Sequence, residues 1–491
     1  MKLIRSETYY ERQFTYRSKM GVYSNFNVTV KLDRVVTPTH LSHALRHMIR
    51  KRPNLALTAD DNDQVMLLDE IQFNDVCVFE EESEFNEQTL ERLNEIRFDT
   101  NSPTWRIVVW QSPQTSTQWI SCVFEHTFYD GMSGSFFAED LVEALTGVHE
   151  PKKTPLDFCD VVYSSDEPYE VNDEPVKLTR SISHAGYPKD PSSPSLKRSA
   201  SYAPITPTPR PQIYGPTSEV CDLYSSGGWW WTIKHLLLEI LPSFFKKHYI
   251  KWTEGIDLFA HPKYTNLPAK FGSHTNYRII NIKPAELLTR LRNNSMTLTP
   301  YLAAVVTRCF QQVIVPHIKP DAQKYSVNCS LVVNGRRFYP EKADELRYNL
   351  CMSAIDVILP PPPIHETENQ IISADTIDIS HQLAVGLHSR EPFGLISLWR
   401  FISPSAYFNG LCGSHCRSTT EVSNLGLCDF STPKFKVKDM WFSQDIGLSC
   451  HAGFSVISTP EGGMNLVMGI LDEYLPYVDD YVKAVDSHLH K

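Results

Sequence analysis

The chain of 491 residues has a formal net charge of −10, and hydrophobic residues make up 42% of it. This length exceeds what one hydrophobic core usually supports, so two domains are expected. The acidic balance predicts no broad basic surface, which argues against nucleic acid as a partner.

The 11 cysteines form no Cys-x-x-Cys pair, and Cys412 and Cys416 are too isolated to predict a zinc site. Others, such as Cys122 and Cys309, stand inside apolar runs, which is typical of buried free thiols in a reducing compartment. The charged N-terminus lacks the pattern of a signal peptide, and no uninterrupted apolar stretch predicts a membrane-spanning helix.

Residues 1–164 are predicted to form the first domain. The helix of this region begins at Thr37, a good N-cap, followed by Pro38 in the first turn. Hydrophobic periodicity predicts strands over 26–30, 105–110 and 118–125, and helices over 37–52 and 133–145.

Residues 165–225 differ in kind, because proline, serine and threonine dominate the segment. Such a composition cannot bury enough apolar surface to offset the entropy of ordering, so a disordered insertion is expected. Arg180-Ser181 and Lys197-Arg198-Ser199 fit phosphorylation by basophilic kinases, and an unmodified linker is the alternative.

Residues 226–255 combine Trp229-Trp230-Trp231 with an apolar run that Lys234, Glu239 and Pro242 interrupt. An aromatic-rich helix with basic flanks can lie in a membrane interface, which makes 229–245 a candidate for peripheral membrane contact. A packing helix between domains explains the same pattern, and both interpretations stay open.

Residues 256–491 are predicted to form the second domain. Periodicity predicts strands over 277–282, 326–333, 449–458 and 464–471, and helices that begin at Thr299 and at Val478.

The sharpest chemical motif is Glu125-His126-Thr-Phe-Tyr-Asp130-Gly131, between a buried strand and a helix. An imidazole with a pKa near ~6.5 can take a proton from a hydroxyl or an amine at neutral pH. Asp130 is placed to orient the loop, and Gly131 permits a tight backbone where the helix begins. The spacing of His126 and Asp130 also occurs in structural pairs, so a buried core histidine is the alternative.

With its flanking strand and helix, this motif resembles the coenzyme A-dependent acyltransferase superfamily of chloramphenicol acetyltransferase, the plant BAHD enzymes and condensation domains. Three further segments match in order: 297–306, 333–340 with Tyr348-Asn349, and 420–426 with Ser423-Asn424-Leu-Gly. The layout most resembles the fungal alcohol O-acetyltransferase family. The terminal Asp-Phe-Gly-Trp-Gly of the BAHD branch is absent.

The resemblance implies an α/β fold, a two-domain chloramphenicol acetyltransferase-like sandwich with the active site in a tunnel at the domain interface. It implies that His126 is the general base and that Asp130 is a structural acid paired with an arginine. Arg336 is the candidate for that partner and Arg337 the alternative. Gly131 would support the site by its place at the start of the helix.

The resemblance also implies that Ser423 or Asn424 donates a hydrogen bond to the tetrahedral oxyanion, although both can instead close a turn. No residue is assigned to bind coenzyme A, and neither a metal nor a permanently bound cofactor is expected. Acetyl-CoA would be a co-substrate.

The implied function is acetyl transfer from acetyl-CoA to a small hydrophobic alcohol. The alternatives are N-acetylation of a lipid-like amine or toxic amphiphile, a non-catalytic member that binds a lipid or partner, and a condensation-type domain acting on carrier-bound acyl groups. A cytoplasmic monomer is expected, with peripheral contact at the endoplasmic reticulum or lipid droplets through 229–245.

Overall fold

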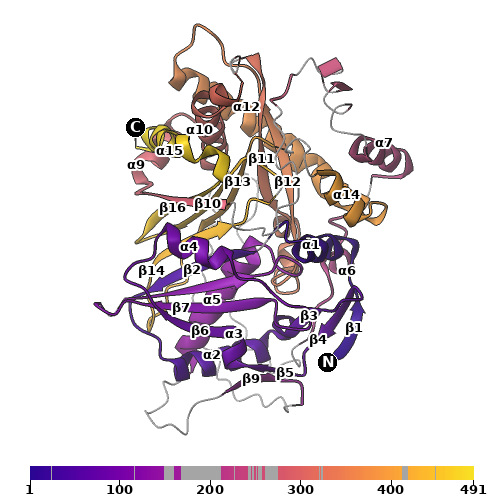
Figure 1. Ribbon diagram of the computed structural model, residues 1–491, viewed down its shortest axis with the longest axis vertical. Coiled ribbons are helices and arrows are strands. Elements are labelled where there is room, and N and C mark those ends of the chain that lie inside the picture. Colours follow the sequence, from indigo (N-terminus) through magenta and orange to yellow (C-terminus); the bar gives the residue numbers. More distant parts are fainter. Residues whose placement is uncertain are drawn as a thin grey trace, which may run out of the picture.

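The protein has two halves, each built on a β-sheet and stacked along the long axis of the molecule (Figure 1). The computed structural model describes residues 1–23, 25–115, 117–148, 160–166, 212–225, 227–240, 245, 248–249, 251–252, 257–259, 275–319, 321, 324–411, 418–447 and 449–490.

The first half contains a five-stranded sheet in the order β14-β2-β8-β7-β6. Its strands are β14 (Val437–Gln444), β2 (Phe26–Leu32), β8 (Gln118–Phe124), β7 (Trp105–Gln111) and β6 (Cys77–Glu81). Only the β6–β7 pair of this sheet is parallel. Helices α2 (Pro38–Lys51) and α5 (Gly131–Gly147) pack on each other, and α5 packs on β2 and β8.

The second half contains a six-stranded sheet in the order β10-β16-β15-β13-β11-β12. Its strands are β10 (Thr275–Ile282), β16 (Gly463–Leu471), β15 (Ala452–Thr459), β13 (Thr420–Leu427), β11 (Val327–Asn334) and β12 (Met352–Leu359). Central strands β11, β13 and β15 run parallel. Helix α10 (Leu298–Val313) packs on β11 and β13 and contacts helices α12 (Glu368–Ser389) and α15 (Val478–Leu489), which also touch the sheet.

Shorter elements complete the described part of the chain. Two small sheets have the orders β1-β4-β3 and β5-β9. Their strands are β1 (Lys2–Ser6), β4 (Gln64–Leu67), β3 (Leu57–Ala59), β5 (Glu70–Gln72) and β9 (Val161–Ser164). The remaining α-helices are α1 (Tyr9–Lys19), α3 (Phe73–Val76), α4 (Glu87–Asn94), α6 (Thr217–Val220), α7 (Trp229–Ile240), α9 (Ala285–Asn293), α11 (Val315–Ile318), α13 (Glu391–Leu395) and α14 (Pro404–Leu411).

Strand β14 shows that the predicted boundary at residue 256 does not separate the two halves in space. Although β14 belongs to the C-terminal part of the chain, it pairs antiparallel with β2 and forms the edge of the first sheet. Its Met440 and Phe442 are buried in the core of the first half. The sequence analysis predicted no strand over 437–444, and the sheet that this strand joins depends on long-range pairing.

Part of the predicted insertion 165–225 is ordered, so the expectation of disorder is wrong for residues 212–225. There Leu223 and Tyr224 are buried, and the Tyr224 hydroxyl donates to the Leu350 carbonyl at 3.1 Å. These apolar side chains lie beyond the proline-rich stretch that motivated the prediction. Residues 167–211 lie outside the described residues.

One helical stretch, Leu298–Ile318, is long and apolar enough to cross a membrane by composition. In its apolar window 78% of the residues are buried inside the protein. It therefore packs as a core helix of the second half, where Leu302 and Phe310 are fully buried.

Candidate active site

His126 is the second residue after the end of β8, and its ring lies among aromatic side chains. Only 6% of its surface is exposed. Its ring stacks on Phe14 of α1, with centroids 4.2 Å apart and planes 7° apart. Tyr23 and Phe26 present their rings at steep angles, at 5.5 and 5.1 Å. Three rings therefore restrict the orientation of the imidazole.

The environment of His126 favours a neutral imidazole. Burial lowers its pKa from the ordinary value to about 4, and the positive charge of Arg17 acts in the same direction. The negative charge of Asp130 opposes this shift but does not outweigh it. A ring that is unprotonated at neutral pH can accept a proton.

Helix α1 holds the histidine loop in place from the side opposite the sheet. Ser18 donates a hydrogen bond to the Glu125 carboxylate, and the hydroxyls of Thr15 and Thr127 lie 3.1 Å apart within hydrogen-bond distance. Glu125 also accepts from the Thr127 backbone N–H at 2.8 Å. The residues on both sides of His126 are therefore anchored.

Asp130 turns away from the imidazole and caps helix α5. Its Oδ1 accepts from the backbone N–H of Ser133 at 2.9 Å, and its Oδ2 accepts from Arg336 at 2.7 Å and from the Cys351 N–H at 2.9 Å. Burial alone would raise the pKa of Asp130, but Arg336 and the other donors lower it below the usual value. Asp130 is thus a buried, ionised cap that joins the two halves.

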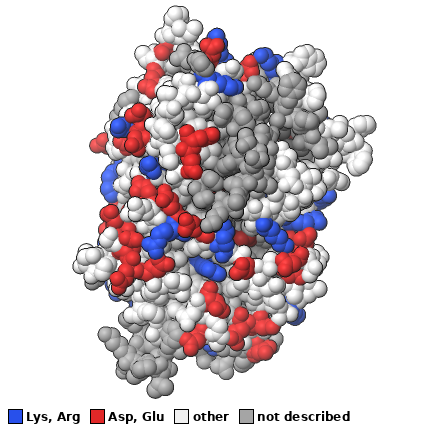
Figure 2. Space-filling model, in the orientation of Figure 1, with Lys and Arg blue, Asp and Glu red and all other residues white. Residues whose placement is uncertain are grey.

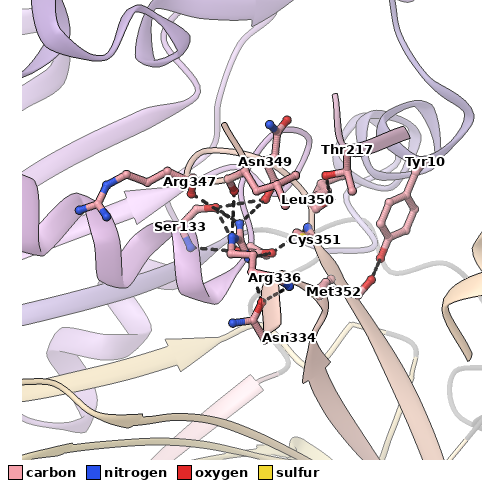
Figure 3. Close-up of polar contacts among 12 residues, drawn as sticks. Tyr10, Ser133, Thr217, Asn334, Arg336, Arg347, Asn349, Leu350, Cys351 and Met352 are labelled. Carbon is pink, nitrogen blue, oxygen red and sulfur yellow. Dashed lines mark hydrogen bonds and ion pairs between the residues drawn. The ribbon is translucent and has the colours of Figure 1, made fainter. Parts of the chain in front are cut away.

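Arg336 lies at the centre of a hydrogen-bond network between the halves, as Figure 3 shows. Besides Asp130, its guanidinium donates to the carbonyl of Leu346 at 2.8 Å and to that of Asn349 at 2.6 Å. The predicted pair of Asp130 with Arg336 is therefore present. No described contact joins Asp130 to the alternative, Arg337.

A second buried ion pair crosses the same interface further along α5, at Asp140. Arg347 donates to both carboxylate oxygens of Asp140, at 2.9 and 2.7 Å, and Tyr348 donates to the same group at 2.7 Å. Arg347 was not predicted from the sequence. Together with Asp130 and Arg336, this pair fixes α5 against the segment that connects β11 and β12.

A cavity of about 270 Å³ opens between the halves and brings the predicted site residues together. His126, Asp130 and Gly131 line it from the first half, and Ser423 and Asn424 line it from β13 of the second half. Five of the six predicted site residues therefore line one space to which each half contributes, whereas the sixth, Arg336, does not line it and contacts Asp130.

Gly131 is required by the close approach of the two halves. A Cβ atom at this position would lie 3.1 Å from Leu425 of β13 and 3.1 Å from Phe442 of β14. Any larger residue would press the start of α5 away from both strands. The predicted reason, a tight backbone, differs from the observed one, which is the space that tertiary packing leaves.

Ser423 and Asn424 differ in their availability for chemistry. The Asn424 side chain donates to Thr299 at 3.1 Å and accepts from the Gly426 N–H at 2.8 Å. Its amide thus links β13 to the first turn of α10. Ser423 is buried beside the cavity and makes no such link among the described residues. Of the two predicted oxyanion donors, the Ser423 hydroxyl can donate to a ligand in the cavity, whereas the Asn424 amide is already engaged.

Sequence reasoning missed the contribution of α1 to the site. Phe14 and Arg17 both line the cavity, and the Arg17 guanidinium lies 5.1 Å from the Phe14 ring centroid. Thr8 and Glu11 form a capping box, so a helix was detectable. That this helix covers the histidine depends on contacts between residues more than 100 positions apart.

The described residues contain no group of three or more His, Cys, Asp or Glu side chains that could hold a metal ion. The face of the molecule shown in Figure 2 mixes acidic and basic side chains without a broad basic field.

The fold has two halves, and a buried histidine lies at the cavity between them. The sequence profile of the alcohol acetyltransferase family matches residues 8–188 and 231–479, and the chain belongs to this family. It is 22% identical over 520 residues to the N-acetyltransferase SLI1 of Saccharomyces cerevisiae, with 96% of this chain and 98% of that protein covered.

Solved structures share the architecture at low identity. The TRI3 trichothecene 15-O-acetyltransferase from Fusarium sporotrichioides has a TM-score of 0.62 and 12% identity, covering 99% of this chain and 94% of that one. The first condensation domain of the calcium-dependent antibiotic synthetase has a TM-score of 0.58 and 12% identity, covering 100% and 98%. The predicted chloramphenicol acetyltransferase-like fold is thereby confirmed. The protein is a coenzyme A-dependent acetyltransferase by family.

Proposed function

We propose that the protein transfers the acetyl group of acetyl-CoA to the hydroxyl of a hydrophobic acceptor, with His126 as general base. The observation that carries this proposal is the position of His126: a buried, neutral imidazole faces the cavity where the two halves meet. Its family membership supports an acyl-CoA as the donor.

In the proposed reaction His126 takes the proton of the acceptor hydroxyl while the oxygen attacks the thioester carbonyl. The tetrahedral intermediate collapses as the C–S bond breaks, and the imidazolium returns the proton to the departing thiolate. The products are an acetyl ester and free coenzyme A. Holding both reactants in one cavity supplies much of the acceleration, because a bimolecular encounter becomes a local one.

Ser423 is proposed to stabilise the oxyanion of that intermediate. Its hydroxyl lies in the same cavity as His126 but comes from the opposite half, so the reacting carbonyl would sit between them. Such a preorganised donor acts in a site from which water is largely excluded, where it is typically worth ~3 kcal/mol. Asp130 and Arg336 would act only as positioning residues.

The cavity wall favours an apolar acceptor. Leu395, Leu398 and Trp399 line it from the segment after α12, and Phe408 lines it from α14. Apolar walls with a few convergent polar groups are typical of sites for small organic ligands. A hydrophobic alcohol would bury its chain there and present its hydroxyl to His126.

An amine acceptor is the second candidate, and two observations favour it. The relative SLI1 is an N-acetyltransferase that matches nearly the whole chain. Glu421 and Asp445 also line the cavity, where their negative charge would attract a cationic amine.

The test is release of free coenzyme A from acetyl-CoA by the purified protein, across matched alcohols, sterols and long-chain amines, with product identification by mass spectrometry. We expect turnover with at least one acceptor class, and about 10³-fold lower turnover with the His126→Ala variant. Turnover confined to amines would replace the first candidate by the second. Equal turnover in the variant would remove His126 from the mechanism.

A further inference from the structure

Helix α7 (Trp229–Ile240) turns its aromatic face outward. Trp229 and Trp230 are 71% and 82% exposed, and Leu237 is 57% exposed. At 100° per residue these three side chains, together with half-buried Ile233, lie on one side of the helix. A surface helix normally points such a face into the core, so α7 is oriented opposite to the usual pattern.

The other face of α7, which carries Trp231, is fixed to the second half. The Trp231 ring packs against Gly394 of α13, where a Cβ atom would lie 3.3 Å away. His235 lies 3.0 Å from the Glu391 carboxylate, and Thr232 is buried. The helix is therefore anchored by residues that leave Trp229 and Trp230 outside.

We propose that the outer face of α7 (Trp229, Trp230, Ile233, Lys234 and Leu237) binds the surface of a lipid bilayer. Tryptophan is enriched where a membrane meets water, because its ring is apolar and its N–H stays hydrated. Lys234 is exposed beside the tryptophans and matches lipid phosphates in charge. The protruding edge that α7 occupies in Figure 1 is almost wholly uncharged in Figure 2.

The size of this face favours a bilayer over a second protein. Aromatic side chains bury ~150–250 Å² each, so Trp229 and Trp230, which are 71% and 82% exposed, supply roughly 300 Å², to which Leu237 adds a smaller area. A stable protein interface buries roughly 800 Å² on each partner. A membrane needs no matching partner surface, and a few interfacial tryptophans suffice for reversible binding.

Helix α7 also lies over the wall of the catalytic cavity. Its anchor, α13, leads directly into residues 396–400, and α7 packs on that turn. Ile396, Leu398 and Trp399 of this turn line the cavity. Resting on the proposed function, we infer that membrane contact places the cavity next to the lipid phase, from which a long-chain acceptor can be drawn.

The binding test is flotation of the full-length protein with phosphatidylcholine vesicles. Wild type should float, and the double variant Trp229→Glu/Trp230→Glu should lose binding by about tenfold or more. The matched control is Ile364→Glu/Ile377→Glu, which places the same charges on exposed isoleucines elsewhere. All three proteins should show the same thermal melting temperature, because the replaced side chains are exposed.

Three results would overturn the bilayer proposal: no flotation of the wild type, equal flotation of the tryptophan variant, or equal loss in the isoleucine control. Concentration-dependent dimers that the tryptophan variant abolishes, without flotation, would instead make the face an interface between copies.

An activity measurement separates this proposal from the proposed function. The tryptophan variant should raise KM for a long-chain acceptor embedded in vesicles and leave KM for a short, water-soluble acceptor unchanged. Vesicle binding by a protein without transferase activity would leave the membrane face standing and reject the proposed function. An equal KM change for both acceptors would reject the role of α7 in acceptor delivery.

Discussion

Two buried arginine–aspartate pairs stabilise different regions of this protein. Arg308 of α10 donates to both oxygens of Asp375 of α12, at 2.6 and 2.9 Å, entirely within the second half. Arg336 donates to Asp130 at 2.7 Å and joins the second half to the first. All four residues are more than nine-tenths buried.

The difference between the pairs lies in what each holds. Asp375 is paired far from the cavity and does not line it, whereas Asp130 caps α5 four residues after His126 and lines the cavity. Two similar buried ion pairs can therefore have different roles: Arg308–Asp375 stabilises the fold, whereas Arg336–Asp130 also positions the loop that carries His126. A buried pair is therefore interpretable only together with the element it positions.

The largest expected effect tests whether chemistry resides at the interface. His126→Ala should lower kcat by about 10³-fold, because general base catalysis typically contributes ~10²–10⁴-fold. The free energy of unfolding should fall by ~2–4 kcal/mol, because removing the buried ring leaves a cavity, so kcat is measured at a temperature where the variant stays folded. Steady-state kinetics and thermal unfolding measure the two effects. A variant with unchanged kcat would place the chemistry elsewhere.

The second prediction compares the two pairs directly. Arg336→Ala and Arg308→Ala should each lower the free energy of unfolding by ~3–5 kcal/mol, because each leaves a buried carboxylate without its partner. At a temperature where both variants remain folded, only Arg336→Ala should reduce kcat. Chemical denaturation and kinetics on the same samples check this. Equal loss of kcat in both would erase the distinction.

The third prediction concerns pH. Because the pKa of His126 is about 4 in the folded protein and ordinary when unfolded, the unfolded chain binds more protons between these values. The contribution of His126 to the free energy of unfolding is fully present above pH ~6.5 and falls by about 3 kcal/mol as pH drops toward ~4. Unfolding measured across pH should show this slope in the wild type, and a shallower one in His126→Ala.

The smallest expected effect is a difference in kcat between variants of two serines that line the same cavity. Ser423→Ala should lower kcat by about 10²-fold with little change in KM, if its hydroxyl stabilises the oxyanion only in the transition state. Ser330, which lines the same cavity from β11 and donates to Asp356 at 2.8 Å, provides the control. Ser330→Ala should keep kcat within a few-fold. Equal values for both variants would show that Ser423 merely lines the wall.

Local patterns in the sequence were sufficient for the elements that carry the motif. The strand before His126 and the helix after Asp130 follow from hydrophobic period and capping, and both occur where predicted. The pairing of Asp130 with Arg336 was accessible only through the family resemblance, which implies an arginine partner for this aspartate. Arg347 gave no comparable signal.

The sequence by itself determined the strand and helix that flank His126, the His126 motif and the family it resembles, since these depend on neighbours within a few residues. Only the tertiary structure decided that β14 joins the first sheet, that α1 covers His126, and that the tryptophans of α7 face outward. The physical reason is that such contacts join residues far apart in sequence. Their free energy depends on which surfaces remain to be buried after the local elements have formed.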